Sequence, residues 1–182
     1  MSRQRILWIT QTAIFIALLL SAQAFTRPLG QFVTGSCVNF ILVTACILAG
    51  LSSAAIVAVM SPLFAFMILG IPVFPLLIPF MMAGNLVLVT VIHFIAGKSF
   101  DRLNKLAWIR IIIGVLGGAA AKFLVLWLGI VQIALSFIPD IRQPQIEAMS
   151  ATFSWPQLVT ALIGSSIAVA VMPMLKRALK RI

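Results

Sequence analysis

The sequence has few charged residues, and the shortage is greatest for acids. Only 9% of the 182 residues are Asp, Glu, Lys or Arg, whereas a soluble globular domain carries about 25%. There are 13 basic residues against 3 acidic ones, which gives a formal net charge of +10. A chain of this composition has too little polar surface to face water, and this excludes a soluble globular protein.

Groups that carry catalysis or hold a metal are also scarce. The chain has one histidine, His93, and it lacks the H-E-x-x-H, G-x-S-x-G and Walker-type P-loop patterns. Its two cysteines, Cys37 and Cys46, fall in one apolar run at a spacing that puts them on opposite faces of a helix. We therefore expect no enzyme, no catalytic residue, no metal site, no disulfide and no cofactor of its own.

Long apolar runs dominate what is present. Hydrophobic residues make up 63% of the chain, and runs of about 15 to 25 of them match a hydrocarbon core about 30 Å thick. The sequence predicts an all-α integral membrane protein, a single domain over residues 1–182 built as a bundle of six transmembrane helices. The predicted spans are Ile6–Phe25, Gly35–Ala49, Ser53–Leu69, Leu76–Ala96, Ala107–Ile133 and Pro156–Leu175.

The basic residues orient this bundle. With the N-terminus inside, only Arg27 and Arg142 fall in outer connections, and ten basic residues fall in cytoplasmic segments. This positive-inside bias predicts that both termini are cytoplasmic, and it assigns the net charge to the anionic inner leaflet rather than to nucleic acid. The ten are Arg3, Arg5, Lys98, Arg102, Lys105, Arg110, Lys176, Arg177, Lys180 and Arg181.

Two features of the predicted topology allow alternatives. The second and third runs are short and joined without charge, so they form either two spans or a re-entrant hairpin. We favour two spans, because re-entrant backbone must be shielded from lipid by other protein. The first run ends in a stretch, Ser21–Ala24, that is similar to a signal-peptidase site, but Ile6–Phe25 is long for a signal core and we expect it to remain uncleaved.

Three polar residues lie deep within predicted spans. Lys122 is near the middle of the fifth run, where a lysine costs about 2.5 to 3.5 kcal/mol, so it should face the bundle interior, near Asn85. Its role is either contact with an anionic or carbonyl group of a ligand or a structural one with helix carbonyls. Asn39 and Asn85 also have two alternative roles: they form hydrogen bonds between helices, or they contact the ligand.

Polar residues also collect in the connections assigned to the outside. Arg27, Gln31 and Thr34 lie in or beside the first connection, and Trp155 closes the longest one, Ala134–Trp155. Long connections in compact proteins are often lids or binding loops. We therefore predict an outward-facing binding site in which these four residues join Lys122, Asn39 and Asn85 as substrate-binding candidates.

The first run carries a stripe of small residues at helical spacing. Its members are Ala13, Ala17, Ser21 and Ala24. Small residues let helices approach closely in lipid. The stripe serves either a contact within the bundle or docking to another membrane subunit.

These features together resemble the substrate-binding S component of energy-coupling factor transporters, the vitamin importers of prokaryotes. The likeness is carried by small size, basic character, six spans, an outward mouth and the absence of an ATPase motif. Locally, Ala13–Ala17 matches the A-x-x-x-A pattern of that family's first helix, and Gly30–Asn39, followed by Gly50 and Ser61-Pro62, is also similar.

The resemblance implies a partner set and a location. Ala13 and Ala17, with Ser21 on the same stripe, would dock on a shared transmembrane coupling subunit in the prokaryotic cytoplasmic membrane. Two cytoplasmic ATPases would supply ATP-driven rearrangement, and the S component would topple to release its vitamin inside. Cobalamin is the first candidate ligand, followed by pantothenate or a pyrimidine vitamin precursor. The alternative is a stand-alone channel or facilitator without ATPase partners.

Overall fold

The computed structural model describes residues 3–100 and 104–179, and within these ranges it is helical without any β-strand. Five helices are long and apolar enough to cross a membrane. The prediction of an all-α, membrane-embedded protein is therefore confirmed. The elements are α1 (Arg3–Thr26), η1 (Arg27–Leu29), α2 (Gln31–Leu69), η2 (Pro75–Leu77), α3 (Ile78–Ala96), η3 (Gly97–Phe100), α4 (Lys105–Leu126), η4 (Trp127–Ile133), η5 (Ala134–Phe137), α5 (Gln143–Thr152) and α6 (Trp155–Leu179).

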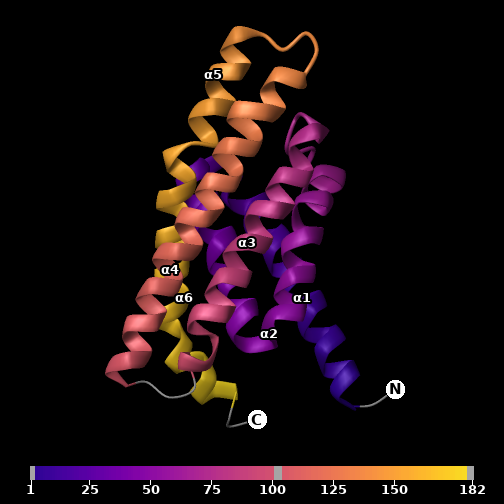
Figure 1. Ribbon diagram of the computed structural model, residues 1–182. Helices are drawn as coiled ribbons and strands as arrows, with labels where there is room; N and C mark the ends of the chain where they lie inside the picture. The colour runs from indigo at the N-terminus through magenta and orange to yellow at the C-terminus, as the bar shows by residue number, and fades with distance from the viewer. Residues whose placement is uncertain (1–2, 101–103, 180–182) are drawn as a thin grey trace.

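The second and third predicted spans belong to one bent element, α2. It contains 39 residues, about twice what a single crossing needs. The bend is at Gly50, whose φ of 84° and ψ of 174° lie in a region that residues with a side chain rarely adopt. Figure 1 shows the chain doubling back here, and Leu42 and Cys46 before the bend share a buried cluster with Ala54 and Ala58 after it.

The bend in α2 lies beside the first turns of α1. Trp8 donates its indole N–H to Ser52 Oγ at 3.1 Å, and the hydroxyls of Thr12 and Ser53 are 2.8 Å apart. Figure 1 shows α1 beginning and α6 finishing at this same end of the bundle, with η3. We call it the terminal end, and we call the opposite end, which α5 covers, the loop end.

Close helix contacts hold the bundle together. Gly164 of α6 lies against the backbone of α2 at Ser36 and Phe40, and Gly118 of α4 lies against Leu88 and Ile92 of α3. In lipid, such small residues allow the close packing that drives helix association. The contacts fix α2, α3, α4 and α6 relative to one another, and these four helices supply most of the polar side chains buried at mid-depth.

The longest predicted connection contains a helix that the sequence pattern did not reveal. Within Ala134–Trp155, α5 covers the loop end of the bundle (Figure 1). Its first turn is closed by the Arg142 backbone N–H, which donates to Gln145 Oε1 at 3.0 Å. Ile146 and Met149 of α5 pack on the buried cluster that includes Leu126 and Phe153. This segment is thus a helical cap rather than an open loop.

Candidate ligand pocket

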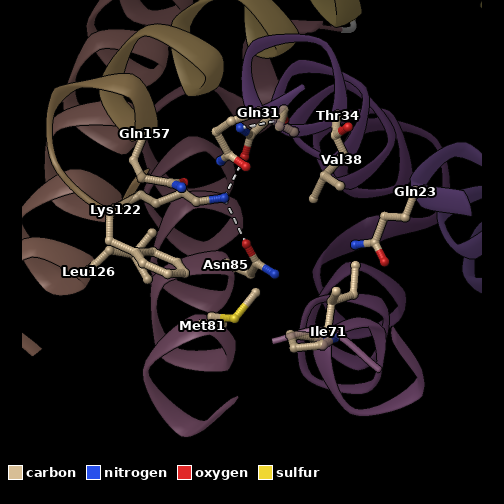
Figure 2. A pocket seen from close by; sticks show the side chains of 14 residues that line it. Gln23, Gln31, Thr34, Val38, Ile71, Met81, Asn85, Lys122, Leu126 and Gln157 are labelled. Atoms are coloured by element: carbon tan, nitrogen blue, oxygen red, sulfur yellow. Dashed lines mark hydrogen bonds between the residues drawn. The ribbon is translucent and has the colours of Figure 1, made fainter. Parts of the chain in front are cut away.

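A buried lysine and two buried amides form the centre of the site. Lys122 on α4 is only 3% exposed. Its Nζ donates to Asn39 Oδ1 of α2 at 2.6 Å and to Asn85 Oδ1 of α3 at 2.7 Å (Figure 2). The prediction that this lysine faces the bundle interior near Asn85 is confirmed, and Asn39 is a second partner.

The backbone of α2 holds both amides in the orientation that serves the lysine. Asn39 donates from Nδ2 to the Gly35 carbonyl at 2.8 Å, and Asn85 donates from Nδ2 to the Ala58 carbonyl at 3.5 Å. Each amide nitrogen is therefore directed at a main-chain acceptor, which leaves each amide oxygen for Lys122. The three side chains join the first half of α2, its second half, α3 and α4 into one polar contact.

The lysine has neutral partners only. In the part of the chain that the structure describes, the acidic residues are Asp140 and Glu147, both exposed at the loop end, and neither touches Lys122. An ammonium group has three N–H donors, and the two amides accept two of them. In its protonated form, Lys122 therefore has one donor left and has no counter-charge among the described residues.

Two adjoining cavities lead from this centre toward the loop end. The deeper one, which we call the chamber, has a volume of about 120 Å³ and is lined by Lys122, Asn39 and Asn85. The outer one, which we call the vestibule, has a volume of about 240 Å³ and is lined by parts of η1, the segment after α2, and α5. Residues that line both are Gln23, Gln31, Thr34, Ile71, Met81 and Phe153.

The structure brings most of the predicted binding residues to these cavities. Gln31 and Thr34 line both of them, and Arg27 lines the vestibule, where its Nη1 donates to the Leu69 carbonyl at 3.1 Å. Trp155 lines neither cavity. It is 61% exposed and packs its ring against Phe32, with ring centroids 5.5 Å apart, because the first residue of α6 points away from the pocket.

Two glutamines of the pocket were missed in the sequence. Gln23 on α1 and Gln157 on α6 are 7% and 6% exposed, and both line the chamber. Gln157 donates to the Thr152 carbonyl at 3.1 Å, whereas Gln23 Oε1 is buried without a partner among the described residues. Both are polar residues in or beside apolar runs, the same signal that identified Asn39 and Asn85.

The small-residue stripe of α1 faces away from the bundle. Ala13, Ala17, Ser21 and Ala24 are all exposed, while Leu19 and Gln23 of the same helix are buried. Of the most apolar window of α1, 17% is buried, compared with 33% to 50% in the other four membrane-length helices. The stripe therefore lies on the exposed face of α1, and its surface is available to another membrane protein.

Comparisons of the chain with protein-family models, with curated proteins and with solved structures find no match. What the fold and the site define is a class: a helical membrane-embedded protein with a polar pocket between its helices, reached from one end of the bundle.

Proposed function

We propose that this protein is the substrate-binding S component of an energy-coupling factor type importer. In this proposal the loop end faces outward, and a small micronutrient enters through the vestibule and binds in the chamber. The observation that carries the proposal is Lys122, a membrane-buried cation held by two neutral amides at a cavity. Intramembrane ionisable residues are rare and mark substrate pathways.

The proposed topology has six spans, with the two halves of α2 crossing separately and both termini in the cytoplasm. The distribution of cations supports it, because Arg5, Lys98, Lys105 and Lys176 gather at the terminal end and the loop end has Arg27 and Arg142. A cytoplasmic terminal end agrees with the positive-inside rule. It also directs the pocket toward the external substrate.

The dimensions of the pocket favour a small ligand. Ligand sites for drug-sized molecules measure about 300 to 1,000 Å³, and the chamber and vestibule, at about 120 and 240 Å³, are each smaller than that range. Pantothenate or a pyrimidine vitamin precursor suits this space better than cobalamin, which stood first by sequence. A corrinoid would need the loop end to open widely.

The proposed partners are a shared transmembrane coupling subunit, which docks on α1, and two cytoplasmic ATPases. The exposed stripe of α1 supports this assignment, since α1 is the least buried of the membrane-length helices. The direct test is purification of the tagged protein from its native membrane. Recovery of a membrane subunit with two ATPases supports the proposal, and ligand flux in vesicles that contain this protein alone supports the stand-alone facilitator instead.

Substitution of the stripe tests the docking surface. We expect Ala17→Trp to abolish ATP-dependent uptake, because an indole at this exposed position prevents close helix approach. Ligand binding by the isolated protein should be retained, since Ala17 lines neither cavity. Ala120→Trp, at an exposed position of α4, is the matched control and should transport normally. Normal uptake by Ala17→Trp would remove α1 as the docking helix.

A further inference from the structure

The polar groups around the chamber are unevenly balanced between donors and acceptors. The oxygens of Asn39 and Asn85 are both occupied by Lys122, and their nitrogens are bonded to backbone carbonyls. In its protonated form, Lys122 keeps one N–H and its positive charge for the molecule that fills the cavity. A buried ammonium group without a counter-charge is unfavourable, and a negative charge on the ligand would remove this cost.

A second polar group without a hydrogen-bond partner lies on the other side of the cavity. Figure 2 shows Gln23 across the pocket from Lys122, and Gln23 Oε1 is buried without a hydrogen-bond partner among the described residues. A buried carbonyl oxygen that lacks a donor is destabilising. A ligand that reaches from Lys122 to Gln23 therefore needs a hydroxyl or an amide N–H at its far end.

The charge of the ligand is limited to one. Among the described residues, Lys122 is the one cation that lines the chamber. Arg27, in the vestibule, is exposed and already donates to the Leu69 carbonyl, so solvent screens it. A second negative group on the ligand would lie among amides and apolar side chains without a matching charge.

On the basis of the proposed function, we propose that the ligand is a small monocarboxylate with an uncharged hydrogen-bond donor at its other end. The carboxylate accepts the remaining N–H of Lys122 in the chamber. The hydroxyl or amide N–H of the ligand donates to Gln23 Oε1, and the rest of the molecule extends into the vestibule.

Matched pairs of acids and neutral analogues test the charge directly. The probes are pantothenate with pantothenol, and biotin with its primary amide, added to purified protein in detergent. The readouts are thermal unfolding and calorimetric affinity. We expect at least one acid to stabilise the protein and to bind about tenfold or more tightly than its neutral partner, the effect of one charge-assisted hydrogen bond.

Three variants assign the effect to Lys122. Lys122→Met should reduce the preference for the acid to less than about threefold, since the side chain keeps its length and loses its charge. Asn85→Asp should do the same with Lys122 present, because the new carboxylate supplies the counter-charge from within the protein; this keeps the test valid if Lys122→Met fails to fold. Lys105→Met, at an exposed site outside both cavities, should retain the full preference.

The outcomes separate this inference from the proposed function. Neutral partners that bind as tightly as the acids, or a set of acids none of which stabilises the wild-type protein, would overturn the monocarboxylate assignment even if the protein purifies with a coupling subunit and ATPases. Acid binding by a protein that purifies alone would support the assignment while removing the importer.

Discussion

Lys122 and its two amides form a unit in which each residue depends on the others. Hydrogen bonds to a charged group contribute about 1.5 to 3 kcal/mol each. Removal of one asparagine leaves the ammonium group with one hydrogen-bond acceptor fewer, and removal of the lysine leaves both amide oxygens without its N–H donors. Lys122, Asn39 and Asn85 should therefore show strong energetic coupling.

A double-mutant cycle measures that coupling. We expect Asn85→Leu to lower the free energy of unfolding by about 1.5 to 3 kcal/mol. In the double variant with Lys122→Met the loss should be smaller than the sum of the two single losses, by about 0.5 to 3 kcal/mol. Denaturant unfolding in detergent micelles provides the measurement. Gln132→Leu, an exposed amide on η4, is the control and should change little; additive losses at Asn85 and Lys122 would contradict the coupling.

At the level of single residues, the sequence predicted part of the pocket. The pairing of Lys122 with Asn85 follows from energetics, because an isolated cation in an apolar span must find polar neighbours. The participation of Gln23 does not follow from the run that contains it, since only the packing of α1 on α2 determines which face of α1 is buried. Trp155 was selected for its position beside a loop, and the direction of its side chain depends on where α6 begins.

At the level of whole helices, the contact between α2 and α6 determines the position of Asn39. An added Cβ at Gly164 would overlap the Ser36 carbonyl oxygen and lie 2.7 Å from the Phe40 backbone nitrogen. Both atoms belong to the backbone of α2, on either side of Asn39, so they cannot move aside as a flexible side chain would. Any larger residue at Gly164 must push the two helices apart.

Substitution of this glycine tests the helix contact. We expect Gly164→Ala to lower the free energy of unfolding by about 1 to 3 kcal/mol, the usual effect of overpacking, and to weaken binding because Asn39 moves with α2. Gly117→Ala is the matched control, since its nearest neighbour would be Val91 Cγ1 at an ordinary 3.7 Å. Equal stability and affinity of the two variants, measured by unfolding and calorimetry in detergent, would mean that α2 and α6 have room to separate.

The membrane-length helices could be predicted because each is a long apolar run, and such runs have few alternative structures in lipid. The helix α5 could not be predicted in this way. It has 10 residues of mixed polarity, and its Ile146 and Met149 find apolar neighbours only once α3, α4, η4 and η5 are assembled around them. Short helices that depend on tertiary packing leave a weak pattern in the sequence.

The whole molecule has two chemically different ends, and accessibility distinguishes the possible orientations. In a background with Cys37→Ala and Cys46→Ala, single cysteines at the exposed positions Ser52 and Ser136 report on the terminal end and the loop end. We expect a membrane-impermeant thiol reagent to label Ser52→Cys only from the cytoplasm and Ser136→Cys only from outside, since the cations gather at the terminal end. Labelling of Ser52→Cys from outside would contradict six spans in this orientation.

The order of the helices along the chain bears on how the protein is made. Synthesis proceeds from the N-terminus, so α2 and α3 leave the ribosome before α4, and the acceptors Asn39 and Asn85 precede Lys122 into the bilayer. The lysine helix is therefore made after the two helices whose amide oxygens accept hydrogen bonds from its side chain in the folded protein. A permuted gene that encoded α4 first would present the same cation to bare lipid.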